Sequence, residues 1–172
     1  MKTDKSTGKK VLRHYGRAIK FNYGMIPQTW ENSQWQDKVT GCYGDNDPID
    51  VVDLTDKDMP LYHVPNLKVL GILCLIDQDE LDWKVLAMDE AFAKDRGIRD
   101  INQYKQQNPG AVEELMEWFR TIKTFDGKPE NRFAYDDQVL SVEKTIEVIH
   151  ENHQSYHDLI GGKIKNDDNL AF

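Results

Sequence analysis

Two long apolar runs near the middle of the chain constrain its fold more than any other feature. LKVLGILCLI spans residues 67–76 and DWKVLAMD spans residues 82–89, and both are dense in Val, Leu and Ile. Such runs, bounded by polar residues, predict buried strands. The polar stretch 77–81 between them predicts a hairpin. A shorter strand is predicted over residues 49–54, after Pro48.

The second half of the chain has the period of helices instead. Apolar residues recur at helical spacing between Val112 and Ile122, and we expect Asn108-Pro109 to cap this helix and fill its first position. A last helix is predicted to start at Ser141 and to end at Gly161-Gly162. Strands followed by helices indicate an α+β domain.

Charge is unevenly distributed along the 172 residues. The net charge is −8, but residues 1–20 hold +6 and the other 152 residues hold −14. We expect residues 1–20 to be a basic tail or remnant, 21–163 to be a single folded domain, and 164–172 to be a loose tail. The acidic balance argues against nucleic acid as a partner.

Membrane insertion and secretion are not expected. No apolar run approaches the ~20 residues that a membrane-crossing helix needs. The basic start is not followed by the apolar segment of a signal peptide. A cytoplasmic location is therefore expected, or an organelle if an upstream segment carries a targeting signal.

The sequence GDNDPIDVVD, residues 44–53, places Asp45, Asp47 and Asp50 within six positions. Carboxylates this close repel one another unless cations hold them, and Mg²⁺ and Ca²⁺ prefer such oxygens. The alternative is a solvated acidic turn. An EF-hand is excluded, because Asp50 stands where that loop needs Gly and Asp56 where it needs Glu.

A second acidic group lies on the predicted hairpin. Asp77 ends the first strand and Asp82 opens the second, so they come together at one end of the sheet. Alternation puts Asp82 and Lys84 on one face. For this segment alone a surface ion pair is the simpler interpretation. Together, the two acidic groups have the composition of a multi-metal phosphoryl-transfer site, in which a carboxylate deprotonates an activated water.

These motifs resemble the soluble family I inorganic pyrophosphatases of the eukaryotic branch. DNDPID is similar to the D-x-D-P-x-D signature of that family, and further matching segments follow in the same order. The segments are NYGMIPQTWE (22–31), TGCYGDNDPIDV (40–51), DWKVLA (82–87), EWFR (117–120) and DGKPEN (126–131). The resemblance implies a small closed or partly open OB-like β-barrel with two main helices packed outside. It also implies hydrolysis of diphosphate with several Mg²⁺ ions, Mn²⁺ or Zn²⁺ being substitutes, and we expect a homo-oligomer.

The resemblance implies a role for each aspartate. Asp45, Asp50 and Asp82 resemble the ligands of a high-affinity metal ion, and Asp50 would share a second ion. Asp77 and Asp82 would hold an ion that arrives with the substrate. Asp47 resembles the base that orients and deprotonates the attacking water.

The resemblance also implies contacts to phosphate and marks departures from the family. Lys84 and Lys123 resemble cations that meet the substrate and the leaving phosphate, and Tyr23 resembles a tyrosine beside the nucleophile. Ile19 and Ile122 stand where phosphate-contacting tyrosines are expected, and isoleucine cannot donate a hydrogen bond. Residues 1–20 show no match to the family's N-terminal strand region. Weaker turnover, a wider polyphosphate range, or a non-catalytic metal- and phosphate-binding relative are the alternatives.

Three histidines on the last predicted helix stand apart from these motifs. His150, His153 and His157 have the spacing i, i+3 and i+7. Such spacing could bind a transition metal. Without a cysteine or carboxylate motif nearby, a half-polar helix face is the simpler interpretation.

Overall fold

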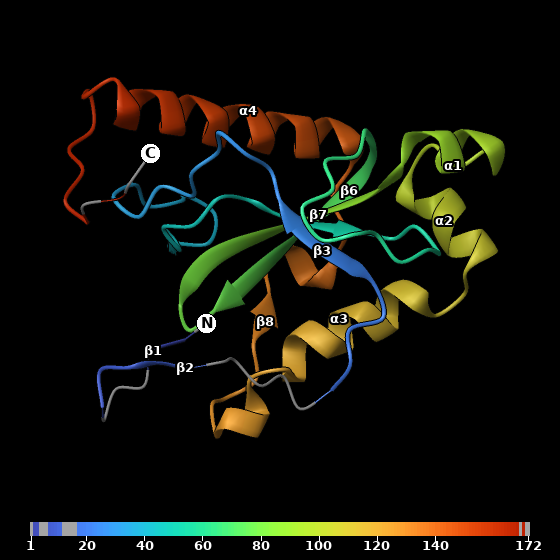
Figure 1. Cartoon of the computed structure of the whole chain (residues 1–172), viewed down its shortest axis with the longest axis horizontal. Coiled ribbons are helices and arrows are strands. Elements are labelled where there is room, and N and C mark those ends of the chain that lie inside the picture. The colour runs from blue at the N-terminus through green and yellow to red at the C-terminus, as the bar shows by residue number, and fades with distance from the viewer. Residues whose placement is uncertain (1, 4–6, 12–16, 169, 171–172) are drawn as a thin grey trace.

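A computed structural model describes residues 2–3, 7–11, 17–168 and 170, and confirms the predicted α+β class (Figure 1). The expected tails, 1–20 and 164–172, lie partly outside the described residues. No described helix is both long enough and apolar enough to cross a membrane.

The elements in chain order are β1 (Lys2–Thr3), β2 (Lys10–Val11), β3 (Asn22–Met25), β4 (Tyr43–Gly44), β5 (Asp50–Asp53), β6 (Leu67–Asp77), β7 (Glu80–Asp89), α1 (Glu90–Asp95), α2 (Ile101–Gln107), α3 (Ala111–Thr121), η1 (Thr124–Asp126), β8 (Arg132–Phe133), η2 (Tyr135–Asp137) and α4 (Val142–Ile160).

The main sheet is built around the predicted hairpin. Its strand order is β3-β5-β7-β6-β8, and β4 pairs with one end of β7. Gln78 and Asp79 form the β6–β7 turn with φ of 53° and 67°, as a two-residue turn of a right-twisted hairpin requires. β5 lies parallel to β7, whereas β3 and β6 are antiparallel to their neighbours. Among the described strands the sheet is open, the partly open form of the expected barrel.

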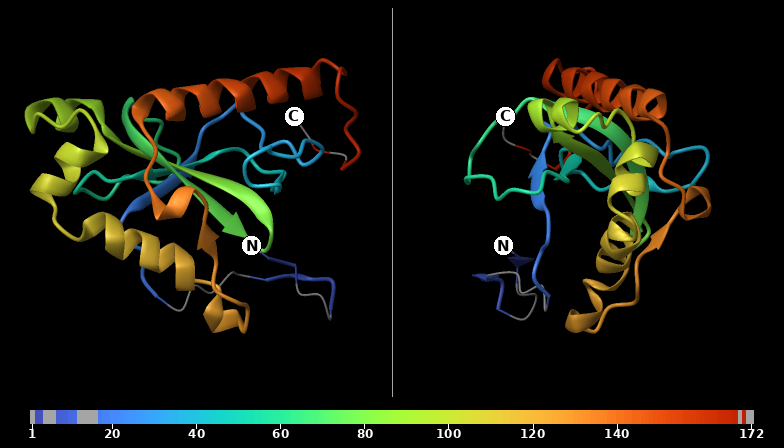
Figure 2. Two further views of the ribbon diagram at one scale, coloured as in Figure 1. Left: turned by 180° about the vertical axis from the view of Figure 1, so that it is seen from behind. Right: turned by 90° about the vertical axis from the view of Figure 1, so that its right-hand side faces the viewer.

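Helices cover both faces of the sheet (Figure 2). On one face Leu73 and Leu86 pack with α3 through Leu115 and Phe119. On the other face the apolar side chains of β6 and β7 share a cluster with Val148 of α4. The long runs are mostly apolar because both faces of β6 and β7 are buried.

The ends of α4 follow the prediction, but the start of α3 does not. Ser141 accepts a hydrogen bond from the backbone N–H of Lys144 at 3.3 Å, and Gly161 ends α4. Helix α3 begins after Gly110, whose φ is 82°, so the predicted cap at Asn108 is wrong. Asn108 instead ends α2, where its side chain donates to the carbonyl of Tyr104 at 3.1 Å. Helix α2 is short and has few apolar positions, so its period did not reveal it.

Candidate active site

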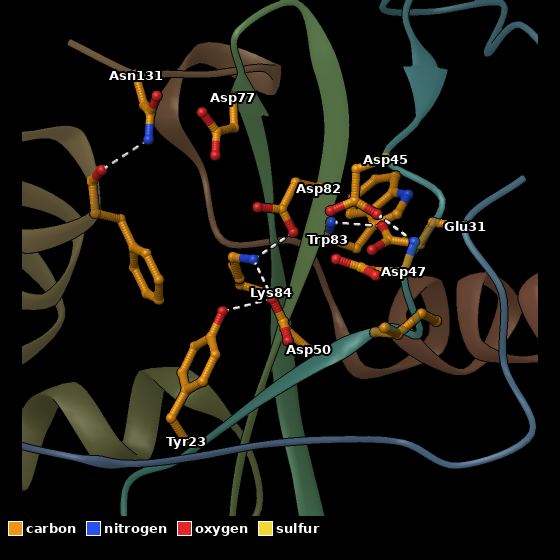
Figure 3. Close-up of polar contacts among 12 residues, drawn as sticks. Tyr23, Glu31, Asp45, Asp47, Asp50, Asp77, Asp82, Trp83, Lys84 and Asn131 are labelled. Carbon is orange, nitrogen blue, oxygen red and sulfur yellow. Dashed lines mark hydrogen bonds and ion pairs between the residues drawn. The ribbon is translucent and has the colours of Figure 1, made fainter. Parts of the chain in front are cut away.

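Strand register brings four of the predicted site residues to one face of the sheet. Asp50 of β5 pairs directly with Lys84 of β7, and Asp82 lies two positions earlier on β7. Tyr23 of β3 pairs with Val52, which shares a face with Asp50. The side chains of Tyr23, Asp50, Asp82 and Lys84 therefore converge beside α3 (Figure 3).

Lys84 is the cation at the centre of this face and is only 2% exposed. Its Nζ lies 2.5 Å from Oδ2 of Asp50 and also pairs with Asp82. The hydroxyl of Tyr23 donates to the same Asp50 oxygen at 2.5 Å. Burial lowers the pKa of Lys84, but the carboxylates of Asp82 and Asp50, with Tyr23, outweigh it and raise the pKa well above its usual value. The ammonium group therefore stays charged.

A second ion pair lies at the turn end of the same face. Lys123, just after α3, pairs with Asp77 at the end of β6. Asn131 secures this end of α3, because its side chain donates to the carbonyl of Phe119 at 3.1 Å (Figure 3).

Asp82 lies between the two ion pairs (Figure 3). Burial raises the pKa of Asp82 to about 6 against the opposing effect of Lys84, and the charges of Asp50 and Asp77 raise it further.

The third part of the site is a group of carboxylates around Glu31. One oxygen each of Glu31, Asp45 and Asp82 lie within 4.8 Å of one another. Glu31 is 2% exposed and accepts a hydrogen bond from the Trp83 N–H at 2.7 Å, but its Oε2 has no hydrogen-bond partner among the described residues. Asp47 is exposed beside this group, and its N–H donates to Asp45 Oδ1 at 3.0 Å (Figure 3).

The electrostatics of this carboxylate group fit a divalent cation. Burial, with the charges of Asp45 and Asp82, raises the pKa of Glu31 well above its usual value. Burial raises the pKa of Asp45 to about 7, and Asp82 adds to the rise. These shifts show that the ionised carboxylates are unfavourable so close together, and a hard cation with oxygen ligands would relieve that repulsion.

All eight predicted site residues lie in this region of the structure, in the two ion-paired groups around Lys84 and Lys123 or in the carboxylate group around Glu31. Glu31 itself had no predicted role, although it is the last residue of the motif 22–31. Of the two replaced tyrosines, Ile122 is buried in the α3 core cluster and Ile19 is 40% exposed. The predicted site residues are Tyr23, Asp45, Asp47, Asp50, Asp77, Asp82, Lys84 and Lys123.

Gly44 allows the close approach that brings Glu31 beside Asp45. A Cβ at Gly44 would lie 2.4 Å from the backbone carbon of Glu31 and 2.5 Å from its oxygen. We expect Gly44→Ala to displace the Glu31 segment and to cost about 1–3 kcal/mol of unfolding free energy. Gly24→Ala is the matched control, because its Cβ would meet only Val51 at 3.6 Å. Urea denaturation of the two variants tests this, and equal stabilities would contradict it.

Stability in metal-free buffer is expected to fall as pH rises from about 4 to about 7. The folded chain keeps protons on Asp45 and Asp82 up to pKa values of about 7 and about 6, whereas unfolded aspartate releases them near pH 3.9. The extra bound protons favour the folded state at low pH, and this advantage is lost as pH rises through the folded pKa values. Thermal melts of wild type and Asp45→Asn across pH isolate the effect, because the variant should show a flatter profile.

Mg²⁺ is expected to raise the melting temperature more at about pH 8 than at about pH 5.5, since a bound metal ion requires deprotonated carboxylates. At a concentration of ~100 Kd, one bound ion would add about 2.7 kcal/mol. Equal gains at both pH values would contradict a metal ion bound by these carboxylates.

Comparison with known proteins identifies the family of this chain. The sequence profile of the family described as inorganic pyrophosphatase matches residues 1–157, so the chain belongs to the inorganic pyrophosphatase family. The match begins upstream of the motifs, in the segment for which sequence reasoning found no counterpart. The family implies dependence on divalent metals.

Relatives of known name extend across most of the chain. It is 40% identical to soluble inorganic pyrophosphatase 1, chloroplastic, of Chlamydomonas reinhardtii over 99% of this chain and 60% of the relative. It is 43% identical to human inorganic pyrophosphatase over 83% of this chain and 50% of the relative. A mouse relative, named mitochondrial, is 40% identical over 81% of this chain and 42% of that protein. The chain spans about half the length of these relatives.

Solved structures give the same family. The recombinant inorganic pyrophosphatase from T. brucei brucei has a TM-score of 0.85 and 34% identity, over 94% of this chain and 47% of that one. The N-terminal-domain-truncated vacuolar soluble pyrophosphatase of Trypanosoma cruzi, solved with PPi, has a TM-score of 0.84 and 34% identity, over 93% of this chain and 60% of that one.

Proposed function

We propose that this chain hydrolyses inorganic diphosphate to two phosphates, with several Mg²⁺ ions as cofactors and Mn²⁺ or Zn²⁺ as substitutes. The observation that carries the proposal is the convergence of carboxylates with Lys84 and Lys123 on one face of the sheet. Carboxylates alone would repel a diphosphate, whereas carboxylates that hold cations, flanked by two lysines, would attract it.

Four aspartates are the proposed metal ligands. Asp45, Asp50 and Asp82 would hold the first ion, with Glu31 beside them, and Asp50 would share a second. Asp77 and Asp82 would hold an ion that arrives with diphosphate. When bound, these ions would neutralise the phosphate oxygens and lower the pKa of a water molecule.

Asp47 is the proposed general base. Its carboxylate is exposed beside Glu31 and Asp45, so a water near those residues is within reach of it (Figure 3). It would accept the proton of the attacking water while the neighbouring carboxylates remain engaged.

Lys84, Lys123 and Tyr23 are proposed to position the substrate. The two lysines now neutralise carboxylates, and with those carboxylates engaged by metal ions their ammonium groups would face phosphate oxygens. Burial and the Asp50 carboxylate, against the effect of Lys84, raise the pKa of Tyr23, so its hydroxyl keeps its proton and orients Asp50.

Phosphate release from diphosphate by the full chain, with and without excess Mg²⁺, tests the proposal. Turnover that requires Mg²⁺ is expected, and a folded chain with no turnover at any Mg²⁺ concentration would overturn it. Tripolyphosphate as the substrate tests the wider substrate range.

A second function, binding of metal and phosphate without turnover, is favoured by Ile122, whose buried side chain offers the substrate no hydrogen-bond donor.

A homo-oligomer is proposed because Trp35, Val39 and Tyr43 are 50%, 67% and 47% exposed within one short segment. Light scattering after gel filtration measures the mass, which should be a multiple of the 20.0 kDa of one chain.

We also propose a cytoplasmic location, with an organelle as the alternative because the relatives include chloroplastic and mitochondrial proteins.

A further inference from the structure

Two histidines one turn apart on α4 face each other outside the proposed active site. Nε2 of His153 lies 3.1 Å from Nε2 of His157, and the ring centroids are 4.4 Å apart. Residues at i and i+4 share a helix face, which explains the meeting. His153 is half-buried and His157 is exposed, so solvent reaches the pair.

A backbone carbonyl of a distant loop selects the tautomer of His153. Its Nδ1 lies 2.7 Å from the carbonyl oxygen of Gln28. A carbonyl oxygen only accepts, so Nδ1 carries the proton and Nε2 presents its lone pair toward His157. Histidines that bind metals commonly donate their other ring N–H to a carbonyl in this way, which fixes the ring and raises its basicity.

We propose that His153 and His157 chelate one transition-metal ion of the Zn²⁺, Cu²⁺ or Ni²⁺ class through their Nε2 atoms, with water completing the coordination. Two metal–nitrogen bonds of ~2.05 Å place the nitrogens about 3.3 Å apart at the tetrahedral angle and about 2.9 Å apart at a right angle. The observed 3.1 Å lies between these values. For binding, neutral His157 carries its proton on Nδ1 rather than Nε2, so no proton is lost from the pair.

The surroundings hold the pair in place without competing for the ion. The backbone N–H of Trp30 donates to the carbonyl of Asn152 at 3.1 Å, so the loop that carries Gln28 is fastened to α4 next to His153. The nearby carboxylate of Asp158 already accepts bonds from Gln154 at 2.9 Å and Lys163 at 2.7 Å. Imidazole nitrogens suit Zn²⁺, Cu²⁺ and Ni²⁺, whereas carboxylate oxygens suit Mg²⁺, so the two kinds of site differ in selectivity.

Calorimetric titration of the full chain with Zn²⁺ in excess Mg²⁺ tests the proposal. His153→Gln and His157→Gln are each expected to remove one equivalent of bound Zn²⁺ or to weaken its binding by about tenfold or more. His150→Gln is the matched control on the same helix and should bind as the wild type does. Asp45→Asn should keep this equivalent, which separates the site from the carboxylate group.

Electron paramagnetic resonance of bound Cu²⁺ gives an independent readout and should show coupling to two imidazole nitrogens in the wild type. Thermal melts check that the variants are folded. If His153→Gln fails to fold, the Zn²⁺ titration of His157→Gln tests the proposal, because His157 is exposed and its replacement should leave the fold intact. Wild-type Zn²⁺ stoichiometry and affinity in folded His157→Gln, or no Zn²⁺ bound by the wild type in excess Mg²⁺, would overturn the proposal.

Discussion

Replacement of Asp47 by asparagine is expected to reduce Mg²⁺-dependent phosphate release by about 10²–10⁴-fold, the usual contribution of a general base. The amide keeps the shape of the side chain but cannot take up a proton at neutral pH. Because the carboxylate is exposed, its loss should leave the melting temperature within a degree or two of wild type, as is usual for surface changes. The defect should therefore appear in kcat rather than in the amount of folded protein.

The comparison requires a carboxylate that is equally exposed but remote from the site. Asp95→Asn removes such a charge at the end of α1, which follows the end of β7 away from Asp82 and Lys84, and its turnover should match wild type. Initial rates for the two variants at saturating Mg²⁺ and diphosphate give the ratio directly. If Asp47→Asn keeps full kcat, another group takes the proton and the role proposed for Asp47 is wrong.

Local patterns predicted the central hairpin and the acidic groups because their determinants are close in sequence. The β6–β7 pair needs only two apolar runs and a short polar turn, and Asp82 and Lys84 share a face by alternation alone. The α4 cap at Ser141 is likewise local. Helices α1 and α2 were missed because each has only about two turns, too few for a clear period.

Contacts between distant segments could not be predicted in the same way. Glu31 reaches Asp45 and Asp82 only because its backbone packs against Gly44, and no spacing in the sequence reveals that packing. Asp50 meets Lys84 through the register of a parallel pair, which depends on the whole sheet. The family resemblance placed Asp50 and Lys84 in one site, because a family's motifs carry its tertiary contacts, but it assigned no role to Glu31.

Replacement of Lys84 by methionine is expected to destabilise the metal-free chain by about 3–5 kcal/mol. The substitution keeps the apolar stem but leaves Asp82, 6% exposed, without its counter-charge. Lys144→Met is the matched control, because its partner Glu147 lies at 2.8 Å on the surface of α4, and it should cost under about 0.5 kcal/mol. Urea denaturation in metal-free buffer measures both, and equal costs would contradict the prediction.

Two rescue experiments identify charge as the cause of the Lys84→Met defect. Asp82→Asn in the Lys84→Met background should recover part of the lost stability, because the uncompensated carboxylate becomes neutral. Mg²⁺ should stabilise Lys84→Met more than wild type, since a cation among Asp50 and Asp82 would replace the missing ammonium group. Packing damage would respond to neither change. Lys84 would then hold the carboxylates together before metal binds, and the same positive charge would become available to phosphate once metal ions replace it.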